Sequence, residues 1–353
     1  MIWTFKRYRV KGRTDFKILM LILSGALMIL FILDLFLGSV TIKPSDIVNA
    51  ILGGSDITVN TILTRFRLPK AITAILAGIS LSVCGLQMQT LFRNPMAGPY
   101  VLGISAGASL GVAFVILGFS SNLSADSLRG IGNWMIAVAS WIGAGTVMLI
   151  IIYISSRVKD IMTVLIIGIM LSGGITAIVS IMQYFSNETM LKSYIIWTMG
   201  SLGNLTASQI YVFAASVSLG IILSFFSVKM LNALLLGENY AQSIGLNIKL
   251  ARIVIFSSTS ILAGSVTAFC GPIGFIGIAV PHIARLFLRT SDHKILIPAT
   301  ILTGGAVMLL SDIISQVPGS DNVLPVNSIT SLIGIPVVIW VILRRRQYSE
   351  LFR

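Results

Sequence analysis

Few residues in this 353-residue chain are placed to do bond-making chemistry. Its two histidines, His282 and His293, are eleven residues apart and have no thiol nearby at metal-ligand spacing. The two cysteines, Cys84 and Cys270, each lie inside an apolar run, where a thiol usually behaves as a small hydrophobic group. No G-x-x-x-x-G-K-[ST] loop occurs, so the sequence predicts no P-loop nucleotide site. We therefore expect no catalytic residue, no metal site and no cofactor bound by this chain.

Asp34 and Asp312 are the carboxylates that fall within predicted membrane spans. An ionisable residue inside a membrane usually marks an ion or substrate path. Both residues, however, lie toward the outer ends of their spans, where we expect water or a capping partner to reach them. An ion-coupled transporter would need such a carboxylate for coupling, and this class of protein stays open as an alternative.

A polar, helix-like stretch from Leu231 to Arg252 interrupts the apolar second half of the chain. Within it, Glu238 and Gln242 fall on one face of a short helix that Gly245 is placed to end. Basic residues on both sides predict a cytoplasmic loop. The pattern alone is equally typical of a solvated connector and of a segment that a partner holds.

The elements that position these residues are membrane spans. Hydrophobic residues make up 56% of the chain and charged residues 10%, and the mean hydropathy is +0.95, which predicts an all-α polytopic membrane protein. At about 17–25 residues per span, we expect about ten transmembrane helices, at 18–38, 70–91, 103–119, 133–154, 161–183, 208–228, 252–271, 273–288, 295–316 and 329–343. The net charge of +13 lies mostly at the ends of these runs and not on a basic face with interleaved aromatics, so we expect the lipid bilayer and no nucleic acid as a partner.

An even number of spans returns both termini to one side, and the basic residues of alternate loops predict that this side is the cytoplasm. The expected organisation is a cytoplasmic basic arm (1–17), a single transmembrane domain (18–343) that contains the polar loop 230–250, and a cytoplasmic tail (344–353). The apolar run after the arm is longer than the roughly 7–15 residues of a cleavable signal peptide, so we expect it to remain as the first anchor.

Two segments form an internal repeat: Ile75–Gly85 reads ILAGISLSVCG and Ile261–Gly271 reads ILAGSVTAFCG. In the expected topology the copies cross the membrane in opposite directions. This is typical of an inverted-topology repeat whose halves enclose a transport path, with chance similarity between apolar segments as the alternative. The repeat favours a transporter over a membrane-embedded scaffold.

Five ordered blocks from Arg67 to Pro336 resemble the permease subunits of ABC importers for vitamin B12, ferric siderophores and haem. The family's L-G-E-x-x-A-x-x-x-G-L loop is matched by Gly237, Glu238, Ala241 and Gly245. In that family the loop sits in a cleft of the ATPase subunit. The resemblance therefore implies an ATPase-coupling loop here.

Two further blocks imply a docking site and a gate. Arg67 and Lys70 in R-L-P-K, with Arg65 nearby, are similar to the family's R-L-P-R, which implies docking of the extracytoplasmic binding protein, while snorkelling to lipid head groups is the alternative. The stretch 87–107, QMQTLFRNPMAGPYVLGISAG, resembles the block that forms the family's cytoplasmic gate, with a simple tight reversal as the alternative. The gate residues that the resemblance implies, including two at the start of a pore-lining helix, are Asn94, Met96, Met162 and Thr163.

The most specific match is 271–285, GPIGFIGIAVPHIAR, which resembles G-x-I-x-F-V-G-L-x-x-P-H-x-x-R. We expect Pro281 to kink or shorten its helix. His282 is open to two interpretations, a proton relay or a hydrogen-bonded structural residue, and we favour the second. The residues assigned to this structural motif are Gly271, Gly274, Gly277, Pro281, His282 and Arg285.

The last block, 324–336, departs from the family pattern. Val323 and Asn327 replace a glutamate and a glycine, and upstream Gln316 replaces an arginine that helps dock the binding protein. We therefore expect docking on this lobe to be lost or to use a different charge pattern.

The resemblance implies the type II ABC importer permease fold in a multi-pass protein of the inner membrane. Its implied partners are a second permease copy in a homodimer, two ABC ATPase subunits that hold ATP and Mg, and one extracytoplasmic solute-binding protein. The expected function is import of an iron complex, either a ferric siderophore or haem. Import of vitamin B12 by the same kind of permease and ion-coupled secondary transport are the alternatives.

Overall fold

The computed structural model describes residues 13–38, 54, 57–118, 125–316 and 323–350, and within these residues every regular element is a helix. Residues 1–12 of the expected basic arm (1–17) and residues 351–353 of the expected tail (344–353) lie outside the described residues. Each of the ten expected spans falls on an apolar helix, so the predicted fold class is confirmed.

Seven of these helices, among the described residues, are long and apolar enough to cross a membrane. They are α1 (Arg13–Phe36), α4 (Leu68–Leu91), α6 (Ala125–Arg157), α7 (Ile161–Tyr184), α9 (Ala207–Phe226), α12 (Ile248–Cys270) and α14 (His293–Ser315). The shorter apolar helices are α5 (Ile104–Ala113), which η2 (Phe114–Gly118) continues, α13 (Ile276–Leu288) and α15 (Val326–Glu350). Short elements join them: α3 (Ile57–Ile62) and η1 (Leu63–Arg67) before α4, then α8 (Glu188–Thr198), α10 (Val228–Leu234) and α11 (Glu238–Ser243).

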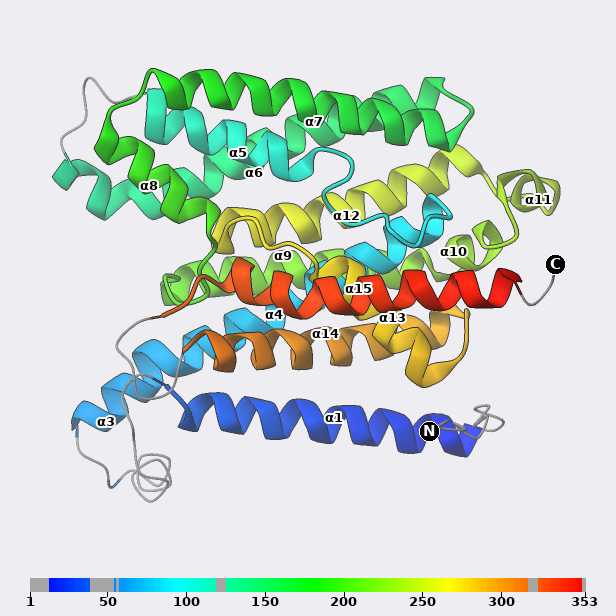
Figure 1. The fold of residues 1–353 in the computed structure, drawn as a ribbon, viewed down its shortest axis with the longest axis horizontal. Helices are drawn as coiled ribbons and strands as arrows, with labels where there is room; N and C mark the ends of the chain where they lie inside the picture. The colour runs from blue at the N-terminus through cyan, green and yellow to red at the C-terminus, as the bar shows by residue number, and fades with distance from the viewer. Residues whose placement is uncertain (1–12, 39–53, 55–56, 119–124, 317–322, 351–353) are drawn as a thin grey trace.

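The long helices lie side by side, so the bundle has two ends (Figure 1). One end carries α3 and α8, and we refer to it as the α8 end. The other carries α11, and we refer to it as the α11 end. Helix α1 begins and helix α15 ends at the α11 end.

The packing of the helices reproduces the internal repeat. The two repeat segments lie on α4 and α12, which run in opposite directions (Figure 1). Helix α4 packs on α13 and α14, and α12 packs on α5 and α6. One half of the repeat consists of α4, α5 and α6, and the other of α12, α13 and α14. The first helix of each half therefore packs on the second and third helices of the other half. This exchange supports the predicted inverted repeat.

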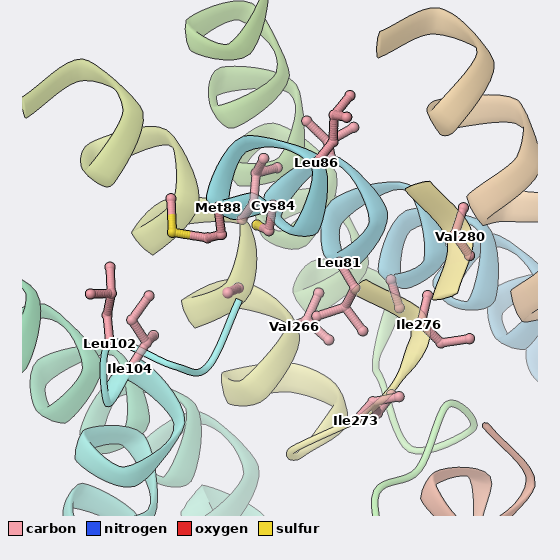
Figure 2. Close-up of a cluster of buried hydrophobic side chains, with 14 of the residues drawn as sticks. Leu81, Cys84, Leu86, Met88, Leu102, Ile104, Val266, Ile273, Ile276 and Val280 are labelled. Carbon is pink, nitrogen blue, oxygen red and sulfur yellow. The ribbon is translucent and has the colours of Figure 1, made fainter. Parts of the chain in front are cut away.

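Close backbone contacts hold the helices together at the centre of the bundle. Such contacts matter in a membrane, because the burial of apolar surface gives helices little reason to associate there. A Cβ atom added at Gly85 on α4 would collide with the backbone of Gly277 on α13, and one added at Gly78 would collide with the backbone of Gly304 on α14. Figure 2 shows the side chains that pack around this contact, among them Leu81 and Cys84. Both cysteines are buried and unpaired, as expected for small apolar groups.

Gly85→Ala places a methyl group where the Gly277 backbone leaves no room. We expect this variant to lose about 1–3 kcal/mol of stability, the usual cost of overpacking. The measurement is the thermal transition in detergent, followed by the fraction that stays monodisperse on size-exclusion chromatography. Gly145→Ala is the matched control because an added Cβ there meets nothing within 4 Å. Equal losses in both variants would contradict the packing argument.

Candidate functional site

The α11 segment is a single helical turn set between two glycines. Gly237 precedes it with φ of 107°, a conformation that disfavours any residue with a Cβ, and Gly245 follows it with φ of 90°. The N–H groups of Gly245 and Leu246 donate to the carbonyls of Gln242 and Ala241, both at 3.0 Å. Gly245 therefore ends the helix, as predicted.

One face of this segment is anchored and the other is open. Ala241 is fully buried against the rest of the chain. The apolar side chains of Leu236, Tyr240 and Ile244 are 63%, 50% and 58% exposed. An apolar face on a short polar segment at the end of the bundle is typical of a surface that a partner covers.

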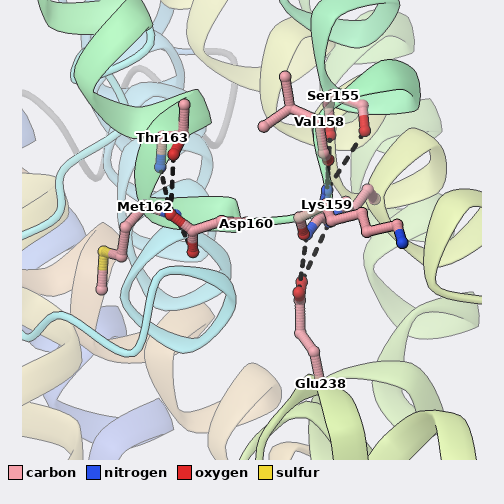
Figure 3. A network of polar contacts seen from close by, with 8 residues as sticks. Ser155, Val158, Lys159, Asp160, Met162, Thr163 and Glu238 are labelled. Carbon is pink, nitrogen blue, oxygen red and sulfur yellow. Dashed lines mark hydrogen bonds and ion pairs between the residues drawn. The ribbon is translucent and has the colours of Figure 1, made fainter.

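Glu238 points into the protein and not toward that open face. Its carboxylate accepts from Nε and Nη2 of Arg252 on α12, at 3.0 and 2.7 Å. Arg252 is buried, and it also donates to backbone carbonyls at the end of α6 and in the turn that follows (Figure 3). The sequence analysis treated Arg252 only as a basic residue that sets topology, so its pairing with Glu238 was missed.

The predicted gate residue Asn94 lies in a non-helical connection between α4 and α5. Its Oδ1 accepts from the N–H of Met96 at 2.9 Å, and the side chain of Met96 is exposed. Arg93 just before it has φ of 47°, and Gly103 at the start of α5 has φ of 83°. The expected break in the helix is confirmed, and its local geometry is a turn stabilised by Asn94.

Met162 and Thr163 lie in the first turn of α7, which Asp160 caps. The carboxylate of Asp160 accepts from the Thr163 hydroxyl at 2.8 Å and from the N–H groups of Met162 and Thr163 at 3.2 and 3.0 Å (Figure 3). These hydrogen bonds, that of the Thr163 side chain first, hold the pKa of Asp160 below its ordinary value. Asp160 stays charged near neutral pH and fixes the start of α7.

The 271–285 motif contacts the end of α4 and the connection that carries Asn94 from the side of α13. Nε2 of His282 donates to the carbonyl of Pro95 at 2.8 Å, and Nη1 of Arg285 donates to Oε1 of Gln89 at 2.5 Å. Pro281 is accommodated within the short α13. The hydrogen bond of His282 favours its structural interpretation over the proton relay.

Two of the three glycines of the motif, Gly271 and Gly277, allow close approach to other segments. A Cβ at Gly271, whose φ is 77°, would lie 2.6 Å from the carbonyl oxygen of Trp197. A Cβ at Gly277 would lie 2.5 Å from Cδ of Pro99. The N–H of Gly274 donates to Oδ1 of Asn327 at 2.9 Å, so this departure from the family pattern ties α15 to the motif.

The basic cluster at the α8 end is mostly engaged within the chain. Arg67 is buried, and its Nη1 donates to the carbonyls of Leu35 and Phe36 at the end of α1, at 2.6 and 2.9 Å. Nζ of Lys70 lies 3.0 Å from Oδ1 of Asp312. Arg65 is exposed. Of these three predicted docking residues, Arg65 is therefore the one fully open to a partner.

Asp34 and Asp312, which we expected either water or a capping partner to reach, are both buried. The amide of Gln316 donates to Asp34 Oδ1 at 3.2 Å and to Asp312 Oδ2 at 3.0 Å, while Lys70 pairs with Asp312. The burial arises because the end of α1, the start of α4 and the end of α14 meet here. Both carboxylates thus have the capping partners that the sequence analysis left open.

A cavity of about 890 Å³ lies beside this network at the α8 end. It is bordered by η1, α8, the end of α12 and the start of α15, and its lining includes Arg67, Lys70, Trp197, Gln209, Phe269 and Leu324. The wall is mainly apolar with a few polar groups, as is typical of pockets for sizeable organic ligands.

A family model matches residues 26–344, which is nearly all of the described helical bundle. The chain belongs to the FecCD transport family. It is 34% identical over 284 residues to the hemin transport system permease protein HmuU of Yersinia pestis, an alignment that covers 80% of this chain and 83% of that protein. It is also 34% identical over 287 residues to the vitamin B12 import system permease protein BtuC of Photorhabdus laumondii. This alignment covers 81% of this chain and 82% of that protein.

A solved structure supports the fold of this FecCD chain. It is described as an inward-facing conformation of a metal-chelate type ABC transporter, and it superposes with a TM-score of 0.80 at 27% identity, over 92% of this chain and 99% of that one. This FecCD protein is therefore an ABC importer permease of the inner membrane, a transport subunit and not an enzyme. An ABC ATPase and a binding protein are its partners by family.

Lys70→Met leaves the buried carboxylate of Asp312 without its cation. We expect a loss of about 3 kcal/mol of stability, at the low end for a broken buried pair because the Lys70 side chain is 19% exposed. The measurement is the thermal transition in detergent. The double variant Lys70→Met with Asp312→Leu removes both charges and should recover part of the loss, whereas Arg65→Met, at an exposed position, should change little. A double variant less stable than the single one would contradict this account.

Proposed function

We propose that this permease imports an iron complex, a ferric siderophore or haem, as a homodimer coupled to two ATPase subunits. The proposed coupling to the ATPase rests on the exposed side chains of the α11 segment. Ala241 and Glu238 anchor its inner face, while Leu236, Tyr240 and Ile244 are exposed. The segment built from Gly237, Glu238, Ala241 and Gly245 would seat this open face in the ATPase. ATP and Mg would be held by the ATPase and not by this chain.

The same assignment gives the orientation. With α11 toward the cytoplasm, the start of α1 and the end of α15 lie on the cytoplasmic side, and the α8 end faces outward. The cavity at the α8 end then lies where cargo arrives from a binding protein. The basic loops predicted for the cytoplasm support this orientation. Of the basic cluster, Arg65 is the residue most open to the docked protein.

The homodimer is supported by helix α7. This helix packs on α5, α6 and η2 through one side, and its other side exposes Ile166, Ile169, Met170 and Ile181. Gly173 and Gly174 lie on this open side, and a Cβ atom added to either meets nothing within 4 Å. Adjacent helical glycines weaken a helix, and in membranes they commonly allow a second helix to approach closely. A second copy of the permease would use this surface.

The cargo assignment rests on what the relatives transport. One relative is a hemin permease, which favours an iron complex, and the matched structure is of a metal-chelate transporter, a description that fits an iron complex and cobalamin alike. The vitamin B12 permease is equally similar in sequence, so cobalamin is the second candidate. Ion-coupled transport has no comparable support, since Asp34 and Asp312 are held by Gln316 and Lys70.

Coupling is tested by purifying the chain from its native membrane in mild detergent and measuring the ATPase activity that accompanies it. We expect activity with the wild type and with Tyr240→Phe, and a loss of at least about tenfold, or 1.4 kcal/mol of association, with Tyr240→Asp. Lys192→Glu, exposed on α8 at the opposite end, is the control that should retain activity. If no ATPase accompanies the wild type in several detergents, the coupling proposal fails.

The cargo is tested by uptake in cells that lack this chain. We expect the deletion to abolish accumulation of radioactive iron supplied as a ferric siderophore or as haem, and to leave labelled cobalamin uptake unchanged. Reintroducing the wild-type chain should restore iron uptake. Loss of cobalamin uptake alone would replace the iron complex by vitamin B12.

A further inference from the structure

Arg252 is a buried junction between three segments that are distant in sequence. Two of its N–H groups hold the Glu238 carboxylate at the start of α11, at 3.0 and 2.7 Å. The others hold the carbonyls of Ser155, Val158 and Lys159 at 3.2, 2.9 and 2.6 Å. These contacts occupy all five N–H groups of a guanidinium, so Arg252 has a single well-defined orientation.

The carbonyls that Arg252 holds lie directly before helix α7. Helix α6 ends at Arg157, and Val158 and Lys159 form the turn that leads to Asp160. A cation at the C-terminal carbonyls of a helix is favourable, which accounts for this side of the junction. Asp160 in turn holds the N–H groups of Met162 and Thr163. Hydrogen bonds from Glu238 through Arg252 to Lys159, the backbone link from Lys159 to Asp160, and the hydrogen bonds of Asp160 thus connect α11 with the first turn of α7 (Figure 3).

The residue before Glu238 faces the other gate connection. A Cβ atom added at Gly237 would lie 3.3 Å from Nη1 of Arg93. Arg93 immediately precedes Asn94 in the connection between α4 and α5. Gly237 therefore lies near the connection that carries Asn94, while Glu238 is linked through Arg252 to the turn before Met162.

We infer that Arg252 is a positioning residue that transmits movement of α11 to the turn between α6 and α7, and so sets the position of the Met162 end of α7. The inference rests on the proposed docking of α11 on an ATPase. When the ATPase displaces α11, the paired Glu238 carries Arg252, and Arg252 carries the three carbonyls of the turn. A lysine at this position keeps the charge but cannot bind the carboxylate in a bidentate way. Its three N–H donors are also too few for the carboxylate and the three carbonyls together.

The test reports the position of α7 directly. Met162→Cys introduces a thiol at a side chain that is 41% exposed, while Cys84 and Cys270 are buried and should react slowly. In the complete complex with its ATPase in nanodiscs, the rate of maleimide labelling is measured without nucleotide and with ATP trapped by vanadate. We expect the two rates to differ by about threefold or more when Arg252 is present. In the Arg252→Lys background we expect their ratio to fall to about one, with ATP hydrolysis retained.

Two further variants sharpen the test. Glu238→Gln keeps one acceptor oxygen but removes the charged, two-point pairing with Arg252, and it leaves the carbonyl contacts of Arg252 in place. It should therefore also bring the ratio close to one, and it serves if Arg252→Lys fails to fold. Lys249→Gln, exposed on the same turn of α12, is the matched control and should keep the wild-type ratio.

The outcomes separate the two proposals. Wild-type ratios in intact complexes of both Arg252→Lys and Glu238→Gln would overturn the inference and leave the proposed importer standing. A ratio of one in the Met162→Cys protein with Arg252 intact would also overturn it, because the start of α7 would then not move with nucleotide. Failure of any ATPase to assemble with the wild type would instead overturn the proposed function.

Discussion

The contact of α4 with α13 and α14 is the constraint on which the rest of the bundle depends. It places backbone against backbone at Gly85 and Gly78, so these helices can be neither rotated nor separated without losing the fit. With α13 fixed in this way, His282 and Arg285 reach Pro95 and Gln89 and hold the connection that carries Asn94. The geometry of the connection that carries Asn94 is therefore a consequence of packing in the middle of the bundle.

At each end of the bundle a buried arginine donates hydrogen bonds to the carbonyl groups where another helix ends. At the α8 end, Arg67 donates to the last carbonyls of α1, and at the α11 end, Arg252 donates to the last carbonyls of α6 and the turn after it. Each arginine lies close to the start of one repeat helix, and each is buried. Carbonyl groups at helix ends that are shielded from water need a partner within the protein, and a guanidinium supplies one while joining two helices. Arg252 differs from Arg67 in also binding the carboxylate of Glu238.

The sequence predicted the elements well and the side-chain partners poorly. The ten spans, the helix end at Gly245 and the break around Asn94 follow from hydropathy and from glycine and proline chemistry, which act within a few residues. The family resemblance identified the polar segment that contains Glu238, but periodicity within one helix does not reveal a partner fourteen residues away on another helix. The burial of Asp34 and Asp312 was missed for the same reason, because three separate helix ends enclose them.

The departures from the family pattern acquire a physical meaning at the α8 end. Gln316, at a position where the sequence analysis expected an arginine, bridges the two carboxylates through its amide, beside the cations Lys70 and Arg67. Asn327, where the family has a glycine, receives the N–H of Gly274 and attaches α15 to the 271–285 motif. Both substituted side chains are thus occupied inside the chain. At the same end Arg65 is exposed, whereas the charge of the partly exposed Lys70 is balanced by Asp312, so the positive charge of the predicted docking cluster is only partly available at the surface.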